Sequence, residues 1–354
     1  MKFKGFCVTV LITGIILCTF SAPLSFAQEE QRSTVIIPPE VKTVFQAGIQ
    51  SREVRADIPF QITHSIFLPA GQQNLHAVIF FKAKNIDLGF APPAAAPQAE
   101  AQEEQPAPTN LVAQNYVFLQ FNKLETQTPG ELVKEIYIPF QVEEESASYD
   151  PEQEGLYTTG YPLPPGNYLL SMAVTSRDFQ KIGTQYLEVT LPDPLSFTDI
   201  IDTTPIIFAK DIKQVATPET TAEVHKDFFA YSILQIEPNL ERIFAPQENL
   251  DIFFFIFGVQ ANAQGQSDIE VHYEVYQGEE LVINYTPQKY QSPLVSQPLP
   301  MKKTVLVRTT KGTETSETRE QRNLEAGSYS LSITITDNIS TKTVKKTIDF
   351  EVGG

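Results

Sequence analysis

The side chains of this sequence best suited to metal or acid–base chemistry are its four histidines, His64, His76, His225 and His272. They are few and scattered, so they do not predict a rich metal centre. His64 and His76 lie symmetrically about Ala70, and if the flanking segments pair as a hairpin, the two rings could face each other across the strands. Two imidazoles alone make a weak metal site. We therefore expect both to occupy ordinary strand positions.

Two charged clusters are the next candidates for chemistry. The run EEESASYDPEQE places six carboxylates in the twelve residues Glu143–Glu154. Calcium favours oxygen-rich loops, but it also needs carbonyl ligands at a fixed spacing, which this run lacks. We interpret the run as a solvated acidic loop, with a calcium site as the alternative. The basic cluster Lys342, Lys345 and Lys346 is interpreted as the solvent-exposed face of the last two strands.

The motifs that usually identify an enzyme are missing. The sequence has no G-x-S-x-G, no H-E-x-x-H, no phosphate-binding loop and no EF-hand calcium loop. Its two cysteines, Cys7 and Cys18, both lie within the first 27 residues. We expect a protein that is not an enzyme, with no catalytic, cofactor-binding or metal-binding residues and no cofactor. An enzyme with a dispersed carboxylate site remains an alternative.

The first 27 residues have the features of a cleaved secretory signal peptide. Two lysines precede an apolar run, Phe6–Phe20, and the small residues Ser25 and Ala27 occupy the positions that a signal peptidase recognises. The run is shorter than the roughly 20 residues that span a bilayer. We predict an exported protein of the periplasm or cell surface whose mature chain begins at Gln28. A membrane anchor and a lipidated Cys18 are the alternatives.

Removal of this segment leaves an acidic chain without thiols. The signal contains two of the 26 basic and none of the 43 acidic residues, so the mature chain has 24 against 43 and a net charge of −19. This charge disfavours nucleic acid and anionic lipid as partners, because both require many basic side chains. The later apolar run Leu250–Val259 has only ten residues and predicts a buried strand. The expected partner is another envelope protein or a surface polymer.

An internal repeat indicates which secondary-structure elements the chain contains. LPPGNYLLSMAV (Leu163–Val174) and LEAGSYSLSITI (Leu324–Ile335) align without gaps at an offset of 161 residues. Both alternate apolar with small or polar residues, which indicates half-buried strands. The spacing shared by the two segments pairs Leu163 with Leu324, Gly166 with Gly327, and Tyr168 with Tyr329.

Each half of the chain predicts an antiparallel β-sandwich. Upstream, AGQQNL (Ala70–Leu75) matches APQENL (Ala245–Leu250), and each leads into a phenylalanine-rich run. Closely spaced strands with almost no helical periodicity favour sandwiches. The Leu-x-x-Gly-x-Tyr pattern looks like the tyrosine corner of immunoglobulin-like domains, in which the tyrosine hydroxyl bonds to preceding backbone. The predicted fold is all-β: two tandem immunoglobulin-like or fibronectin-III-like sandwiches after a signal peptide.

We predict four segments: a signal peptide (1–27), a first sandwich (28–192), a linker with irregular structure (193–227) and a second sandwich (228–354). The first sandwich contains an insert, APPAAAPQAEAQEEQPAPT (91–109), of proline, alanine and acid. Such a composition cannot bury enough apolar surface to hold one conformation. We expect a solvated loop insert, with partner docking as the alternative. The proline-bounded break near the end of the first sandwich predicts two separately folding cores.

The second half of the sequence resembles a known family. The segment YSILQIEPNLERIFAPQENLDIFFFIFGV, followed by LEAGSYSLSITITD and TIDFEV, resembles the β-sandwich portion of exported bacterial proteins associated with the GWxTD domain. The similarity covers roughly 200–352, and the first half is a more distant copy. The chain has no tryptophan, so the GWxTD motif is absent and its role is not carried over. The resemblance implies a bacterial envelope protein with tandem immunoglobulin-like modules.

These patterns predict a binding or scaffolding module in the bacterial periplasm or at the cell surface. Its contact surfaces are expected at strand edges and at loops. The alternative is a carbohydrate-binding module of an envelope or polysaccharide system. The missing tryptophan disfavours this alternative, because sugar rings commonly stack on exposed aromatic side chains.

Overall fold

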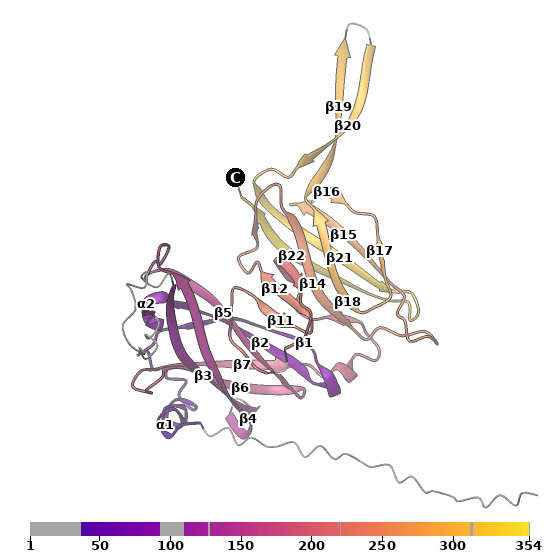
Figure 1. Ribbon diagram of the computed structural model, residues 1–354. Coiled ribbons are helices and arrows are strands. Elements are labelled where there is room, and N and C mark those ends of the chain that lie inside the picture. Colours follow the sequence, from indigo (N-terminus) through magenta and orange to yellow (C-terminus); the bar gives the residue numbers. More distant parts are fainter. Residues whose placement is uncertain (1–36, 93–109, 127, 220, 312–313, 354) are drawn as a thin grey trace, which may run out of the picture. The chain divides into compact units, whose positions relative to one another are not determined.

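The computed structural model describes residues 37–92, 110–126, 128–219, 221–311 and 314–353. These residues form sheets that are antiparallel except for the parallel pair β13 and β22, with only short helices, so the all-β fold class is confirmed (Figure 1). None of their helices is long and apolar enough to cross a membrane. The predicted signal peptide and all but the first two residues of the 91–109 insert lie outside the described residues.

The first sandwich consists of two four-stranded sheets. In one the order is β1-β2-β5-β10, and in the other it is β4-β3-β6-β7, with all neighbours antiparallel. The strands are β1 (Gln61–Pro69), β2 (Leu75–Lys84), β3 (Asn110–Glu125), β4 (Thr128–Glu145), β5 (Glu154–Leu163), β6 (Gly166–Ser176), β7 (Ile182–Leu191) and β10 (His225–Lys226). Aromatic rings fill the space between the sheets: Phe81, Phe140 and Tyr157 pack with centroids 5.1–6.2 Å apart.

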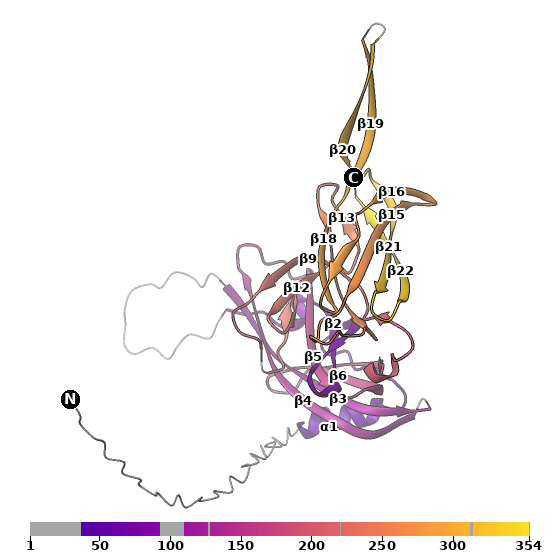
Figure 2. The ribbon, with the colours of Figure 1, turned by 90° about the vertical axis from the view of Figure 1, so that its right-hand side faces the viewer.

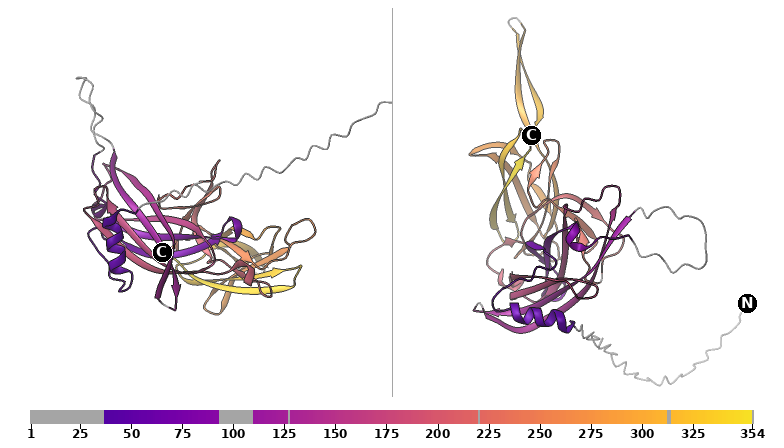
Figure 3. Two further views of the ribbon diagram at one scale, coloured as in Figure 1. Left: turned by 90° about the horizontal axis from the view of Figure 1, so that it is seen from below. Right: turned by 90° about the vertical axis from the view of Figure 1, so that its left-hand side faces the viewer.

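Helix α1 (Pro39–Gly48) covers the outer face of the β4-β3-β6-β7 sheet (Figure 3, indigo helix). Its buried Val41 and Phe45 pack with Phe118 and Ala173 of the sheet. Alternate residues of β3 therefore enter different cores: Val117 contacts the inter-sheet core, and the neighbouring Phe118 contacts the helix. Burial on both faces explains why the central stretch Tyr116–Leu119 of this strand is continuously apolar. The other helical segments are α2 (Asn85–Leu88), η1 (Gly71–Gln73) and η2 (Pro194–Ser196).

The second sandwich also has two sheets. One follows the order β11-β12-β9-β14-β18 with β8 paired to β14, and the other follows β13-β22-β21-β15-β16 with β17 paired to β15. The first contains β8 (Asp202–Thr203), β9 (Ile207–Gln214), β11 (Phe229–Tyr231), β12 (Leu234–Pro238), β14 (Asn249–Phe257) and β18 (Leu294–Pro300). The second contains β13 (Ile243–Phe244), β15 (Ile269–Gln277), β16 (Glu280–Asn284), β17 (Gln288–Tyr290), β21 (Gly327–Asp337) and β22 (Lys342–Val352). A separate two-stranded sheet, β19 (Lys302–Lys311) and β20 (Glu314–Asn323), is inserted before β21.

Strand β14 contributes to more than one core. This is the phenylalanine-rich run that the sequence predicted to be a buried strand. Ile252 and Phe254 point into the second sandwich, whereas Phe253 enters a third apolar cluster. That third cluster contains Val78 and Phe80 of the first sandwich. The prediction of two separate cores therefore needs revision, because packed side chains join the strands of both sandwiches.

The segment 193–227 was expected to be a linker with irregular structure, but it contains three paired strands. Strands β8 and β9 in this segment pair with β14, and β9 also pairs with β12. Farther along, β10 pairs with β5 of the first sandwich. Strands of two residues, such as β8 and β10, are too short to show any periodicity, so only their partners determine them.

Both tyrosine corners are confirmed. Gly166 and Gly327 begin β6 and β21 with φ of 154° and 155°, a region that side chains disfavour. Two residues later, Tyr168 and Tyr329 are each buried in the core of their sandwich. The repeat thus marks the same structural corner twice.

Candidate functional site

A pocket of about 380 Å³ lies between strands β2 and β5 and the segment that follows β9. His76 of β2 lines one wall, and Glu219, Glu223 and His225 line another. Gly160 of β5 makes room for the His76 ring, because a Cβ at this position would lie 2.7 Å from His76 Nε2. Burial lowers the pKa of His76 to about 4, so this imidazole is neutral at physiological pH.

Three side chains of this pocket form a group that could hold a metal ion. The donor atoms of Glu219, Glu223 and His225 all lie within 4.8 Å of one another. One imidazole with two carboxylates suits a divalent transition cation. The same atoms are also satisfied without an ion: Glu219 Oε2 lies 2.9 Å from His225 Nε2, and Thr221 donates a 3.2 Å hydrogen bond to Glu223. Both glutamates are exposed, so the group lies at the protein surface.

Sequence reasoning missed this group. These residues lie in the segment 193–227, which was expected to be a linker with irregular structure, and Glu219, Glu223 and His225 match no metal-binding motif. The pairing of β10 with β5 brings His225 to the pocket, where its ring stacks on Phe228 with centroids 4.6 Å apart. Because β10 has only two residues, no local pattern could have predicted that pairing.

His64 and His76 occupy strand positions, and the face-to-face arrangement considered for their rings does not form. Strands β1 and β2 are a hairpin as expected, but His64 pairs with Phe80, and His76 pairs with Leu68. The two histidines are therefore displaced by four residues along β2. The reason is the loop between the strands: its η1 turn moves the centre of the hairpin beyond Ala70.

The carboxylates of the acidic run are distributed among separate local contacts. Glu144 pairs with Lys226, and Glu152 lies 2.8 Å from Lys84. Asp150 accepts a 2.9 Å hydrogen bond from the backbone amide of Glu152. Within the part of the chain that the structure describes, no group of three metal-ligand side chains forms in this run. The calcium alternative gains no support from this geometry.

Two of the three clustered lysines are not simply solvent-exposed. Lys346 lies 2.5 Å from Asp202, and Lys342 donates a hydrogen bond to the carbonyl oxygen of Thr198. Both are half-buried, whereas Lys345 is exposed. The cluster thus fastens β22 to the segment that had been interpreted as a linker.

A patch of aromatic rings, called here the aromatic face, lies beside α1 on the outer side of the β4-β3-β6-β7 sheet. Tyr116 of β3 packs against Tyr137 of β4 and Phe179 of the β6–β7 turn, with centroids 5.2 and 5.6 Å away. Tyr137 is 40% exposed. Next to the rings, Arg177 donates a 2.5 Å hydrogen bond to Gln114 Oε1. The aromatic face therefore presents flat apolar rings beside planar polar groups.

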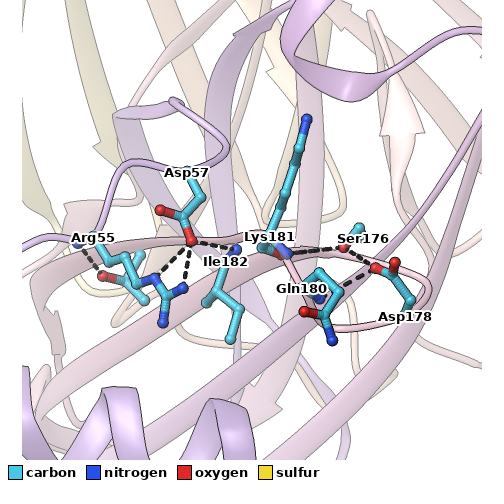
Figure 4. A network of polar contacts seen from close by, with 8 residues as sticks. Arg55, Asp57, Ser176, Asp178, Gln180, Lys181 and Ile182 are labelled. Atoms are coloured by element: carbon cyan, nitrogen blue, oxygen red, sulfur yellow. Dashed lines mark hydrogen bonds and ion pairs between the residues drawn. The ribbon is translucent and has the colours of Figure 1, made fainter.

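A polar network holds the turn that carries Phe179 (Figure 4). Asp57 accepts a 2.7 Å hydrogen bond from Arg55 Nε and a 3.2 Å bond from the amide of Ile182. At the other end of the turn, Ser176 Oγ lies 2.6 Å from Asp178 Oδ1. The Arg55 guanidinium holds the pKa of Asp57 below its usual value, and the Ser176 hydroxyl does the same for Asp178. The network anchors the turn to the segment before β1.

Strands β19 and β20, called here the hairpin arm, extend away from the second sandwich (Figures 1 and 2). They are paired from Lys302 with Asn323 to Lys311 with Glu314. Among the described residues, no third strand joins this ladder. Leu306 is 59% exposed although it lies in the middle of β19. At the base, the amide of Leu324 donates a 3.2 Å hydrogen bond to Met301, and both side chains are buried.

Comparison with known proteins adds little to this picture. No protein-family description and no curated protein matches the chain. The solved structures that match include two of Salmonella alpha-2-macroglobulin, one of a point mutant and one after reaction with methylamine, with 10% and 11% identity and TM-scores of 0.16 and 0.15. Each covers 85% of this chain, which spans only 16% and 17% of those proteins. TM-scores this low carry no argument about fold or function.

Proposed function

We propose that this chain is an exported, non-enzymatic protein that acts as a binding or scaffolding module in the bacterial periplasm or at the cell surface. The signal-like N-terminus supports the location, and the net charge disfavours nucleic acid and anionic lipid as partners. The tandem sandwiches fit the resemblance to envelope proteins associated with the GWxTD domain, and that association is part of the proposal. The binding role is inferred from the hairpin arm, whose edges have no strand partner among the described residues.

An isolated two-stranded hairpin is only marginally stable in water. Both edges of the hairpin arm are without a strand partner among the described residues, so their amides and carbonyls can pair with another chain. Leu306 is exposed, and Val305 and Val307 beside it are half-buried. A partner that adds a strand or packs on this surface would satisfy the edge and cover the leucine. Binding at the hairpin arm would thus stabilise an element that the sandwich alone supports poorly.

The test is photo-crosslinking in the exporting cell. A photoreactive amino acid at Leu306 should give discrete crosslinked species, whereas the same group at Leu132 should not. Leu132 is a matched control because it is also an exposed leucine, 43% against 59%, but lies in β4 of the first sandwich. Equal crosslinking at both positions, or none at Leu306, would contradict the proposal.

A deletion variant separates loss of binding from loss of folding. Because Met301 and Leu324 are hydrogen-bonded neighbours at the base, residues 302–323 can be replaced by two glycines. We expect the far-ultraviolet circular dichroism and the unfolding midpoint of the rest of the chain to change little. Complexes with the partner that are captured from the wild type through a site outside the hairpin arm should not be captured from the deletion variant. A deletion variant that keeps them would place the binding surface elsewhere.

A second candidate is carbohydrate binding, which the aromatic face favours. Tyr116, Tyr137 and Phe179 offer rings for stacking, and Gln114 and Arg177 offer groups that hydrogen-bond hydroxyls. Tyrosine and phenylalanine would take the place of tryptophan here. In affinity electrophoresis with envelope polysaccharide, the Tyr137→Ala variant should migrate faster than the wild type through the polysaccharide gel. Tyr276→Ala, on the second sandwich, should match the wild type. Without any retardation of the wild type, this candidate fails.

A further inference from the structure

The outer edge of β20 is complementary to itself. Residues 316–323 of this strand are all exposed, and one edge is paired with β19 while the other meets no strand among the described residues. Two copies of one strand related by a two-fold axis pair antiparallel about a residue that lies opposite itself. Opposite charges at facing positions stabilise such a pair, and like charges destabilise it. The charges along β20 therefore decide which residue can lie at the centre.

Thr318 is the centre that the charges favour. It places Glu317 opposite Arg319 of the second copy and, by symmetry, Arg319 opposite Glu317. Ser316 then faces Glu320, and Thr318 faces itself. No like charges oppose each other at these positions. We propose that a second copy of this chain pairs with β20 about Thr318, joining two hairpin arms into one four-stranded antiparallel sheet.

Neighbouring centres are less suitable. Pairing about Glu317, Arg319 or Glu320 places that charged residue opposite its own copy. Pairing about Gln321 would also match opposite charges, but this centre lies two residues from the end of β20. The ladder about Gln321 would be short, because Leu324, the first residue after β20, is buried in the sandwich. The Thr318 centre allows a ladder along most of the strand.

The joined sheet would also organise the side chains on one of its faces. Within the hairpin arm, Arg308 is paired across the ladder with Glu317, and Leu306 with Arg319. Arg308 Nε lies 2.6 Å from Glu317 Oε1. In the dimer, Glu317 would lie between Arg308 of its own chain and Arg319 of the second copy. Arg319, which lies opposite Leu306 of its own chain, would then also face Glu317 of the second copy.

This inference rests on the proposed function, since it names the partner of the hairpin arm. Its test is sedimentation velocity on the mature exported chain over a series of concentrations. The wild type should form a dimer that dissociates on dilution, because a two-strand interface is small. Glu317→Arg and Arg319→Glu should each be monomeric alone, since each places like charges opposite each other.

Mixing the two variants is the decisive arm of the experiment. In the mixture, the arginines of one variant face the glutamates of the other, so a heterodimer should form at concentrations where each variant alone is monomeric. The double variant E317R/R319E should dimerise again for the same reason. Restored association also shows that the single variants are folded. A monomeric wild type, single variants that still dimerise, or a mixture that stays monomeric would each overturn the inference.

The crosslinking at Leu306 distinguishes failure of this inference from failure of the proposed function. A monomeric wild type that still crosslinks through Leu306 to another protein would exclude self-pairing but leave the binding role intact. A monomeric wild type without any crosslink would exclude both.

Discussion

The hydroxyl of Tyr329 donates a 2.8 Å hydrogen bond to the carbonyl oxygen of Glu325, four residues earlier in the chain. In the first sandwich, Tyr168 makes the equivalent 2.7 Å bond to Pro164. Both tyrosines are almost completely buried, with 4% and 1% of their surface exposed. Each bond closes the turn that leads into its strand, β21 for Tyr329 and β6 for Tyr168. Without the hydroxyl, the carbonyl oxygen would face an apolar ring and have no hydrogen-bond donor there.

We expect Tyr329→Phe and Tyr168→Phe to lower the free energy of unfolding by about 1–3 kcal/mol each, because the carbonyl loses its partner. Urea denaturation followed by circular dichroism measures the change. Tyr149→Phe is the matched control, because the described residues show no hydrogen bond to that hydroxyl, and it should change the free energy by less than about 0.5 kcal/mol. A corner variant that behaves like the control would show that the bond contributes nothing.

The same variants test whether the sandwiches unfold together. Phe80 of β2 packs on Phe229 of β11 with centroids 5.8 Å apart, inside the cluster that joins both sandwiches. We therefore expect both substitutions to shift one shared calorimetric transition. Two transitions, each responding to only one of the variants, would instead show separately folding cores.

Acidification should destabilise the protein through His76. Burial lowers the pKa of this imidazole from its ordinary value of 6.5 to about 4 in the folded state. Between these values the unfolded chain binds a proton that the folded chain does not, so stability falls as the pH drops from 6.5 to 4, by about 3 kcal/mol in total. Above pH 6.5 the histidine is neutral in both states and has no effect.

The measurement compares urea denaturation of the wild type and His76→Gln at pH 7.5 and pH 4.5. Glu219, Glu223 and His225 line the same pocket, so only the difference between the two proteins isolates His76. The variant should lose less stability on acidification than the wild type. His272→Gln, on the second sandwich, is the control. Equal losses in all proteins would show that the His76 site is not desolvated.

Deletion of residues 93–109 should be tolerated. The flanking residues Ala91 and Val112 exchange backbone hydrogen bonds of 3.1 and 2.8 Å, so a short glycine linker can join the ends. A shorter loop changes the closure cost by about 0.6 kcal/mol per halving. We expect endoproteinase Glu-C to cut first at the glutamates of this segment, and the deletion variant to resist that cut. Loss of cooperative unfolding in the variant would show that the segment packs on the sandwich.

Export should remove the first 27 residues. Ser25 and Ala27 occupy the small-residue positions of the signal, so the mature chain should begin at Gln28, with or without cyclisation to pyroglutamate. Mass spectrometry of the exported protein measures this directly. An intact Met1 or a lipid on Cys18 would show that the N-terminus is an anchor.

Many features of the fold depend only on residues that are close together in the chain, and these could be predicted from the sequence. Alternation of apolar residues predicted the strands, since a side-chain period of two is a property of each strand alone. The Leu-x-x-Gly-x-Tyr repeat predicted both corners, because the turn and the hydroxyl bond involve only neighbouring residues. The apolar run that became β14 predicted a buried strand, which requires no knowledge of its partners.

What only the tertiary structure decided is which segments meet. The register of β1 and β2 depends on the η1 turn, so the sequence could not place His64 relative to His76. Strands β8 and β10 exist only because β14 and β5 pair with them. The pairing of β10 with β5 also brings His225 to Glu219. Both residues lie in a segment without any periodic signal. Packing of Phe253 on the first sandwich likewise depends on the meeting of distant strands, because long-range contacts leave no mark on local periodicity.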